Sequence, residues 1–249
     1  MVTTGTVIRI PSRRALSRLD PATIVAVTVA ALGLWGFAEL LDEVSEGESG
    51  GFDEWLLLAL RQPGDTSQPI GPWWLEIAMN DLTALGSFAV IALMTGGVAG
   101  FLVVRDRFGA AVLLVVSVAS GAILSSLLKV GIDRPRPDIV AQLADVHTLS
   151  FPSGHAMVSA VAYLTIGAVL ASFVEDRRTQ LYIVSAAVTG VVIIGSTRVY
   201  LGVHWPTDVL AGWCIGAAWA MACWLVARLL QGRVLRPPIG AETGPDESA

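Results

Sequence analysis

The sequence predicts an all-α integral-membrane protein, a bundle of six transmembrane helices. Apolar residues make up 54% of the 249 residues and charged residues only 15%, a composition typical of membrane proteins. Stretches without a charged residue are long enough to cross the hydrocarbon core, which takes about 20 residues. They are 21–38, 82–104, 108–128, 156–174, 179–197 and 209–227. Because backbone amides in lipid must be satisfied within their own segment, we expect each stretch to be a helix.

The first stretch follows a segment with four arginines, so a cleaved signal peptide has to be weighed against a retained helix. Its apolar run is longer than a typical signal-peptide core, and no clear small-x-small cleavage site precedes Glu39. We therefore expect a retained helix. The chain then divides into a cytoplasmic N-terminal segment 1–20, a membrane domain 21–231 and a C-terminal tail 232–249. The tail is rich in Pro, Gly and acidic residues and is expected to be disordered.

The distribution of basic residues predicts the orientation in the membrane, because cytoplasmic loops collect Lys and Arg. If six helices alternate, one side receives Arg9, Arg13, Arg14, Arg18, Arg105, Arg107, Arg177, Arg178, Arg228, Arg233 and Arg236. The other side receives Arg61, Lys129, Arg134, Arg136 and Arg198. We expect both termini to be cytoplasmic and the second side to be external, facing the periplasm or the extracellular space.

Net charge, the two cysteines and the loop 42–81 each support one further expectation. The net charge of −5 is weak and no basic run is long, which gives no electrostatic case for nucleic acid as a partner. Cys214 and Cys223 lie nine residues apart in the last apolar stretch and are expected to pack as small apolar residues. The acidic loop 42–81 contains the run FDEWLLLAL and Trp73 with Trp74. These predict a short interfacial helix that either anchors the loop or guides lipid.

The segment 198–208, RVYLGVHWPTD, places a histidine four residues before a carboxylate. Pro206 suits the first position of a helix, which would put Asp208 in the first turn, where the helix dipole favours negative charge. Its carboxylate could accept a hydrogen bond from one nitrogen of His204 and leave the other nitrogen free as a nucleophile. Arg198 would add a fixed cation. Taken alone, His204 could be an ordinary core histidine and Arg198 an arginine that snorkels to the interface. The assignment of a catalytic role therefore depends on their occurring together with Asp208.

The segment Pro152 to His155, PSGH, stands immediately before the fourth apolar stretch. Ser153 is a natural N-cap there, and the N–H groups beside Gly154 would form an anion site. A plain helix cap is the structural alternative. His155 would open the helix and is placed to protonate a leaving oxygen as a general acid.

The segment KVGIDRPRP, 129–137, closes the third apolar stretch with the only lysine of the chain. Proline after each arginine favours an extended loop that aims the guanidinium groups. Arg136 offers planar bidentate donors for phosphate and Lys129 a compact charge. For Arg134, contact with anionic lipid headgroups is the realistic alternative.

These three segments together resemble the type 2 phosphatidic acid phosphatases, whose pattern is KxxxxxxRP, then PSGH, then SRxxxxxHxxxD. Lys129 with Arg136 and Pro137 matches the first element, 152–155 the second, and Arg198, His204 and Asp208 the third, with the spacing preserved. One departure is Thr197, where the family usually has serine. This change puts a hydroxyl contact to phosphate in doubt.

The resemblance implies a mechanism in which His204 attacks phosphorus, Asp208 orients it, and His155 protonates the departing group. It implies that the phosphoryl oxygens are held by Lys129, Arg136, Ser153, Gly154 and Arg198. The family needs no metal or other cofactor, and the sequence has no HExxH or paired CxxC motif. His147, Asp133, Asp138 and Asp145 share the loop before PSGH and are expected to be solvated loop residues.

The implied activity is hydrolysis of a phosphorylated lipid at the external face, with phosphatidate, phosphatidylglycerol phosphate and undecaprenyl diphosphate as candidate substrates. A second enzymatic interpretation delivers the phosphoryl group to another lipid instead of water. Vanadium-dependent haloperoxidases share the three motifs, but their soluble scaffold conflicts with six spanning segments. A noncatalytic headgroup binder or transporter is the alternative of another class, although binding alone has no need for His204 with Asp208.

Overall fold

The computed structural model describes residues 21–146 and 148–234 and shows, over these residues, eight helices and one short hairpin. In chain order they are α1 (Pro21–Glu46), α2 (Gly50–Ala59), β1 (Arg61–Gln62), β2 (Asp65–Pro69), α3 (Trp73–Ala84), α4 (Phe88–Val104), α5 (Phe108–Ile132), α6 (Gly154–Ala171), α7 (Arg177–Tyr200) and α8 (Pro206–Val234). The strands β1 and β2 pair antiparallel. The N-terminal segment 1–20 and nearly all of the tail from 232 lie outside the described residues.

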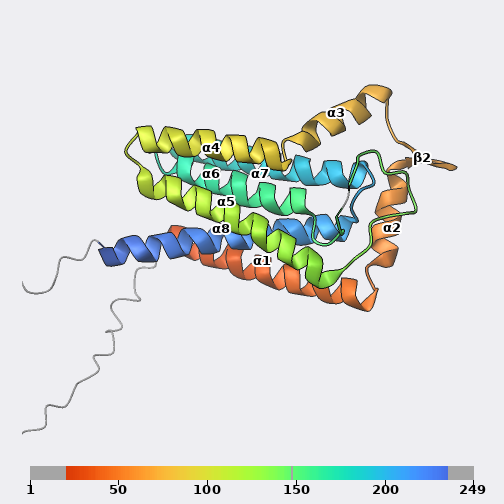
Figure 1. Ribbon diagram of the computed structural model, residues 1–249, viewed down its shortest axis with the longest axis horizontal. Helices are drawn as coiled ribbons and strands as arrows, with labels where there is room; N and C mark the ends of the chain where they lie inside the picture. Colours follow the sequence, from red (N-terminus) through yellow and green to blue (C-terminus); the bar gives the residue numbers. More distant parts are fainter. Residues whose placement is uncertain (1–20, 147, 235–249) are drawn as a thin grey trace, which may run out of the picture.

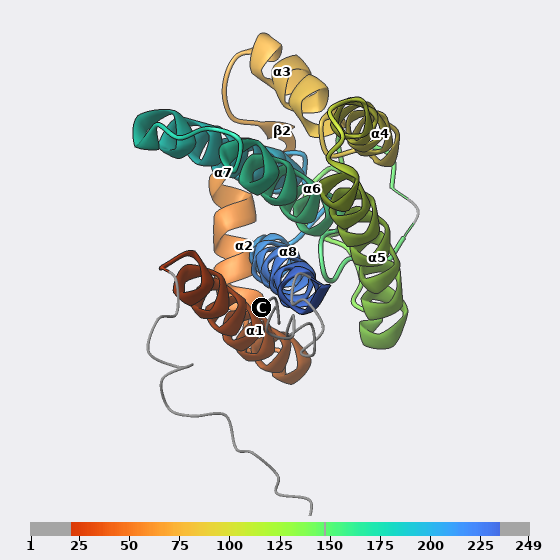
Figure 2. The ribbon, with the colours of Figure 1, turned by 90° about the vertical axis from the view of Figure 1, so that its left-hand side faces the viewer.

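The long helices run side by side along the longest axis of the molecule (Figure 1). Seen end-on, α8 lies near the middle of the bundle, with α1 on one side of it and α6 on the other (Figure 2). Helix α6 also packs against α5 and α7, and α4 packs against α5. The predicted all-α membrane bundle is confirmed, with the two-stranded hairpin as a small addition.

Five of the described helices are long and apolar enough to cross a membrane on their own, namely α1, α5, α6, α7 and α8. The remaining predicted stretch, 82–104, contains a break, because α3 and α4 meet there at an angle of 49°. Ser87 caps the new helix by accepting a hydrogen bond from the N–H of Val90 (3.4 Å). The count of six spans holds when this bent pair is taken as one.

The first helix is longer than its charge-free stretch. The sequence criterion stops at Ala38 because Glu39 follows, but α1 continues for two further turns to Glu46. Acidic side chains such as Glu39 lie on its exposed surface, so they do not end the helix.

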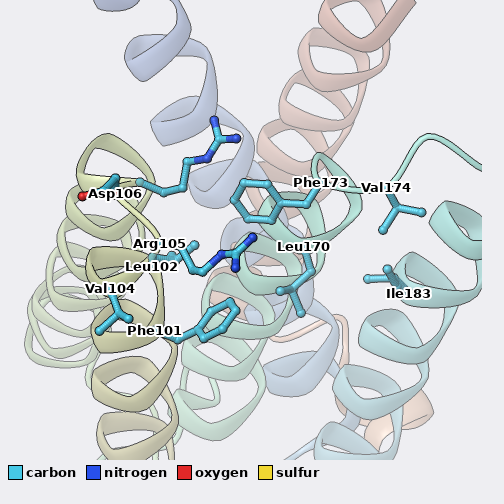
Figure 3. A pocket seen from close by; sticks show the side chains of 10 residues that line it. Phe101, Leu102, Val104, Arg105, Asp106, Leu170, Phe173, Val174 and Ile183 are labelled. Carbon is cyan, nitrogen blue, oxygen red and sulfur yellow. The ribbon is translucent and has the colours of Figure 1, made fainter.

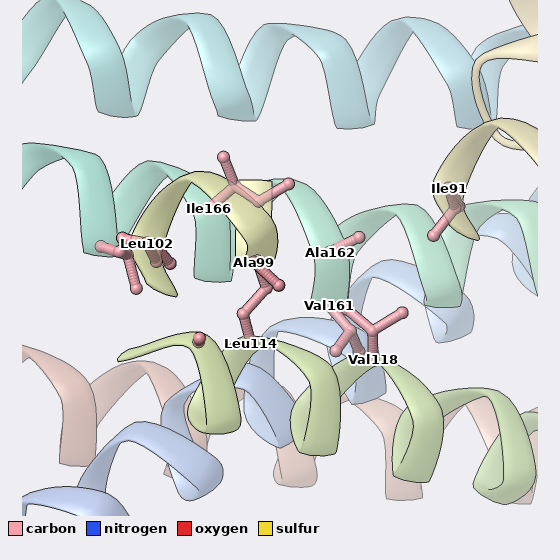
Figure 4. Packing of buried hydrophobic residues seen from close by; sticks show 10 residues of the cluster. Ile91, Ala99, Leu102, Leu114, Val118, Val161, Ala162 and Ile166 are labelled. Carbon is pink, nitrogen blue, oxygen red and sulfur yellow. The ribbon is translucent and has the colours of Figure 1, made fainter. Parts of the chain in front are cut away.

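Small and branched apolar side chains of α4, α5 and α6 form one buried cluster away from the polar segments. Leu102 on α4, Leu114 on α5 and Val161 on α6 are fully buried there (Figure 4). Between membrane helices such contacts act through van der Waals packing, because lipid tails are as apolar as the side chains. The cluster fixes α6 beside α5 and therefore fixes the start of α6 beside the end of α5.

Two glycines bring α8 close to α6. A Cβ atom on Gly212 would lie 2.8 Å from the carbonyl oxygen of Ser153, and one on Gly216 would lie 2.6 Å from that of Met157. The glycine pair 212 and 216 therefore makes the close helix contact that small residues permit in membranes. The second pair with this spacing, Gly96 and Gly100 on α4, faces open space among the described residues.

The shorter elements gather at one end of the bundle. Helix α2 crosses this end, and the hairpin and the long loop between α5 and α6 lie beside it (Figure 1). Asp133 ends α5 in the left-handed conformation (φ 50°), which Asp tolerates better than most residues. The chain then turns away from the helix axis and returns to begin α6 at Gly154.

Candidate active site

The three polar segments of the sequence meet at this end of the bundle, around a cavity of about 380 Å³. Its walls include Lys129, Arg136, Gly154, His155, Arg198 and His204. Thr83, Ala84 and Ser87, at the break between α3 and α4, and Ala144, Asp145, Val146 and Thr148 of the long loop complete the lining. The bend in the second span therefore forms one wall of the cavity.

His204 and Asp208 form a buried pair behind the cavity. Imidazole Nδ1 lies 3.3 Å from carboxylate Oδ2, and the two residues are 2% and 0% exposed. Because the carboxylate accepts at Nδ1, the proton belongs on that nitrogen and Nε2 keeps its lone pair. Pro206 begins α8, so Asp208 lies in the first helical turn as predicted. This is the geometry of an oriented imidazole nucleophile.

The imidazole of His204 is held in its neutral form. Its pKa is lowered to about 3, chiefly by burial and in smaller part by the nearby cations Arg136 and Lys129, while the hydrogen bond to Asp208 and its charge act in the opposite direction. A neutral ring at pH 7 keeps a lone pair available on Nε2. In this structure Nε2 lies 3.2 Å from Nη1 of Arg136.

Two cations of the first segment are fixed by carbonyl groups of the long loop. Nζ of Lys129 donates to the carbonyl of Leu149 (2.6 Å), and Nε of Arg136 donates to that of Thr148 (2.6 Å). Arg136 also donates to the carbonyl of Val203, immediately before His204. Among the described residues neither cation has a carboxylate within ion-pair distance, so both charges can balance an anion.

The third cation, Arg198, and Ser153 provide polar atoms that are buried without a hydrogen-bond partner. Nη1 of Arg198 donates to Oγ1 of Thr83 (2.9 Å), but its Nε has no partner. The Ser153 hydroxyl also has none, and its backbone N–H donates to the carbonyl of Asp208 (2.9 Å). A buried donor left unpaired costs about 1–3 kcal/mol. Four other described atoms share this state away from the cavity, so these two are distinguished by their place, since Arg198 lines the cavity and Ser153 precedes Gly154 of its wall.

Helix α6 begins at the cavity with Ser153 in the N-cap position, as predicted, but the hydroxyl does not cap the helix. Gly154 lies in the cavity wall, and its first-turn N–H has no acceptor within the helix. His155 follows, half-buried, and its ring lies beside Gly86, where a Cβ would approach the imidazole to 3.0 Å. The glycine at the α3–α4 break thus leaves room for His155.

Comparison with known proteins places this geometry in a family. The sequence profile of the PAP2 superfamily matches residues 110–231. Phosphatidylglycerophosphatase B of Bacillus subtilis is 36% identical over 148 residues, which cover 57% of this chain and 70% of that protein.

The chain belongs to the PAP2 superfamily.

Two further comparisons agree with this membership. The crystal structure of the first transmembrane PAP2-type phosphatidylglycerolphosphate phosphatase from Bacillus subtilis superimposes with a TM-score of 0.65 at 26% identity, covering 85% of this chain and 98% of that one. The undecaprenyl-diphosphatase of Sulfolobus acidocaldarius is 37% identical over 68 residues, 27% of this chain and 29% of that protein. With its apolar helices, this PAP2 chain is an integral membrane protein.

One expectation about this PAP2 site needs correction. Arg134 does not reach out to lipid headgroups, because its guanidinium forms ion pairs with Asp53 (2.7 Å) and Asp208 (2.6 Å). Asp53 and Ser150, which donates a hydrogen bond to Asp208, were not predicted as site residues either. Asp53 lies far away in the sequence and no local spacing connects it to the motifs. The repeated Arg-Pro step is the one local signal that could have drawn attention to Arg134.

At the departure from the family pattern, the hydroxyl of Thr197 donates to the carbonyl of Ile194 (2.6 Å), and the residue is fully buried outside the cavity lining. Of the acidic residues in the long loop, Asp145 lines the cavity, whereas Asp133 and Asp138 are absent from its lining. His147 lies outside the described residues. Among those described, no three His, Cys, Asp or Glu side chains are grouped as metal ligands.

A larger cavity of about 620 Å³ lies at the opposite end of the bundle. It is lined by Phe101, Phe173 and other apolar side chains, together with Arg105 and Arg107 (Figure 3). It contains neither a histidine nor a buried carboxylate. The smaller cavity at the PAP2 motifs is therefore the candidate active site.

Proposed function

We propose that this protein is a membrane lipid phosphatase that hydrolyses a lipid phosphomonoester or diphosphate through a phosphohistidine on His204. The observation that carries the proposal is the buried His204–Asp208 pair beside two unpartnered donors, Nε of Arg198 and the hydroxyl of Ser153. A headgroup binder needs the donors but has no use for an oriented, neutral imidazole. A protein that only binds a headgroup would also not require a second histidine at the start of α6.

The first chemical step forms one bond and breaks another at phosphorus. Nε2 of His204 attacks with its lone pair as the bond from phosphorus to the lipid oxygen breaks, and His155 donates a proton to that oxygen. Asp208 stabilises the Nδ1–H of the ring, which gains positive charge when the P–N bond forms. The lipid alcohol, or the shorter lipid phosphate from a diphosphate, then leaves.

The second step regenerates the enzyme. His155, now neutral, accepts a proton from water while the water oxygen attacks phosphorus, and the P–N bond breaks to return the lone pair to Nε2. Inorganic phosphate is released. Lys129, Arg136, Arg198, Gly154 and Ser153 bind the phosphoryl oxygens, whose charge increases towards each transition state. These residues supply the charge balance that a metal provides elsewhere, so the proposal includes metal independence.

Arg136 has to release His204 before the attack. Its Nη1 lies 3.2 Å from Nε2 of the imidazole, where it competes for the lone pair. A bound phosphate offers Arg136 charged oxygen acceptors, which make stronger hydrogen bonds than a neutral ring nitrogen. Substrate binding would thereby free the nucleophile.

We infer that the site faces outward, with both termini in the cytoplasm. Arg105, Arg107, Arg177 and Arg178 lie at the ends of helices opposite to the motifs, and such exposed arginines favour the cytoplasmic side. Among substrates, phosphatidylglycerophosphate ranks first, because phosphatidylglycerophosphatase B, matched over 70% of its length, and the solved phosphatidylglycerolphosphate phosphatase, matched over 98%, carry that activity in their names. Phosphatidate and undecaprenyl diphosphate follow. Transfer of the phosphoryl group to an alcohol instead of water is the second candidate reaction.

Phosphate release by detergent-purified protein tests the proposal. Phosphatidylglycerophosphate, phosphatidate and undecaprenyl diphosphate are supplied separately in excess chelator, with His204→Ala as the paired variant. We expect release from at least one lipid that persists in chelator and disappears in the variant, while the variant keeps the wild-type unfolding temperature. Release that stops in chelator would contradict metal independence, and undiminished release by the variant would contradict the assignment of the nucleophile. Release that requires an added alcohol would favour the transferase.

A further inference from the structure

Asp53 connects the external helix α2 to the first turn of α8. It is fully buried, and its Oδ1 accepts the backbone N–H of Thr207 (2.9 Å) while its Oδ2 accepts the Thr207 hydroxyl (2.7 Å). Thr207 immediately precedes Asp208. A carboxylate that is 0% exposed would be costly without charge compensation, and the compensation comes from Arg134.

Arg134 bridges two buried carboxylates. Its Nη2 lies 2.7 Å from Oδ2 of Asp53 and its Nη1 lies 2.6 Å from Oδ1 of Asp208. Nη1 also donates to the Thr207 hydroxyl (2.8 Å), and the guanidinium lies 5.5 Å from the centre of the Trp205 ring. The planar fork of arginine can make all these contacts at once, whereas the ammonium group of a lysine cannot.

The two oxygens of Asp208 have separate partners. Oδ1 contacts Arg134, and Oδ2 faces Nδ1 of His204 and accepts hydrogen bonds from Ser150 and from the N–H of Trp205 (2.9 Å). Holding Oδ1 fixes the rotation of the carboxylate and so determines where Oδ2 lies. The positive charge on Arg134 also reduces the tendency of Asp208 to take the proton from Nδ1.

We propose that Asp53 and Arg134 are positioning residues for the nucleophile: Asp53 fixes Arg134, and Arg134 fixes the carboxylate that orients His204. This proposal rests on the proposed function of His204. Neither residue lines the cavity, and their polar groups are engaged with each other, with Thr207 and with Asp208. Helix α2 thereby contributes to the chemistry from outside the three motifs, through one buried side chain.

The experiment compares Asp53→Asn, Arg134→Lys and the double variant with the wild type. Asparagine keeps the shape of Asp53 but removes its charge, and lysine keeps the charge of Arg134 but removes the fork. We expect each single variant to lower kcat about 10- to 100-fold with KM within about twofold, as for other groups that orient a catalytic imidazole. Because the two residues act in series, the double variant is expected to be no slower than the slower single variant.

Inhibition by inorganic phosphate separates positioning from general damage. Lys129, Arg136 and Arg198 make no contact with Asp53 or Arg134, so the inhibition constant of phosphate should stay within about twofold in every variant. Glu54→Gln is the matched control, since Glu54 is the exposed neighbour of Asp53 on α2 and losing its charge leaves the ion pairs intact. The control is expected to keep wild-type kcat.

Three results would overturn this role: wild-type kcat in either single variant, multiplied losses in the double variant, or a loss that appears in KM and phosphate inhibition instead of kcat. If Asp53→Asn does not fold, the same measurements on Arg134→Lys test the positioning role. A wild-type protein without phosphatase activity would instead defeat the proposed function. An active wild type with a fully active Asp53→Asn variant would defeat only the positioning role.

Discussion

At the scale of single residues, the state of His204 follows from its surroundings more than from its own chemistry. A histidine in water titrates near pH 6.5, but this one is 2% exposed, beside two cations and one carboxylate. Desolvation disfavours the charged ring by more than Asp208 favours it. The imidazole is therefore neutral across the physiological pH range, as the proposed attack requires.

We expect the His204 ring to stay neutral as the pH falls through 6.5, because its pKa is lowered to about 3. Nitrogen NMR of histidine-labelled protein, assigned by the signal that His204→Gln removes, would measure this. The unfolded chain binds the proton near pH 6.5, so His204 makes the free energy of unfolding decrease as the pH is lowered from about 6.5 towards 3. A titration midpoint near 6.5 would contradict the neutral buried ring.

The unpartnered hydroxyl of Ser153 predicts a loss of activity without a loss of stability. Ser153→Ala removes a buried hydroxyl that has no partner, so the unfolding temperature should stay the same or rise. A hydrogen bond to a charged phosphate is worth about 1.5–3 kcal/mol, so kcat/KM should fall roughly 10- to 100-fold.

Ser159→Ala is the matched control for Ser153→Ala. Ser159 is also buried, but its hydroxyl donates to the carbonyl of Ala156 (3.2 Å), and it lies within α6 instead of at the N-cap position. This variant should lose about 1 kcal/mol of stability and keep its kcat/KM. The same response of activity and stability in both variants would contradict a phosphate contact for Ser153.

Sequence patterns predicted the residues that act through local spacing. His204 and Asp208 are four residues apart, and Pro206 marks the helix start between them, so their meeting could be predicted. Thr83 and Asp53 reach the site from α3 and α2, and no periodicity or spacing links them to the motifs. Their positions depend on tertiary packing, which a pattern in one sequence does not contain.

At the scale of elements, the close contact between α6 and α8 holds the two halves of the site together. Helix α6 begins at Gly154, next to His155, and α8 begins just after His204, so the separation of the two helices sets the distance between the two histidines. Gly212 and Gly216 make this separation small. Both helix starts are thereby fixed by residues within the membrane.

We expect Gly216→Ala to destabilise the protein, because the added Cβ would lie 2.6 Å from the carbonyl oxygen of Met157 and 2.8 Å from the Cβ of Ala160. Overpacking of this kind costs about 1–3 kcal/mol. Gly100→Ala on α4 is the control, because it makes the same substitution where the added Cβ meets no other atom. It should leave stability unchanged or slightly increased. Thermal unfolding in detergent measures both, and equal stability of the two variants would contradict the packing role.

Element boundaries were predicted less well than element existence. Hydropathy located all the spans, but it treated 82–104 as continuous and ended the first helix at residue 38. The break at Gly86 and Ser87 lies at the cavity, and Gly86 leaves room there for His155 and Ile194, a tertiary contact that hydropathy does not contain. The extension of α1 reflects an exposed acidic face that a charge-free criterion excludes.

At the scale of the whole molecule, basic residues occur at both ends of the bundle, but in different surroundings. Lys129, Arg136 and Arg198 gather around the cavity, whereas the exposed arginines of the α4–α5 and α6–α7 connections lie at the other end. If those arginines face the cytoplasm, the substrate headgroup is reached from outside.

Cysteine labelling in intact bacterial cells tests this orientation. Glu48→Cys lies in the connection before α2 and Arg178→Cys at the start of α7, and both positions are exposed. A membrane-impermeant maleimide should label the first variant in intact cells and the second only after the cells are opened, with the wild type as the control for Cys214 and Cys223. The reverse pattern would place the site in the cytoplasm.

The most direct test of the account is detection of the phosphohistidine itself. Wild-type protein is mixed with the preferred lipid substrate and quenched within one turnover under alkaline conditions, and its peptides are analysed by mass spectrometry. We predict a phosphoryl group on His204 that forms and decays at rates compatible with kcat, and that is absent from His204→Ala. Turnover without any phosphorylated His204, or a phosphoryl group on another residue of the active protein, would contradict the central claim.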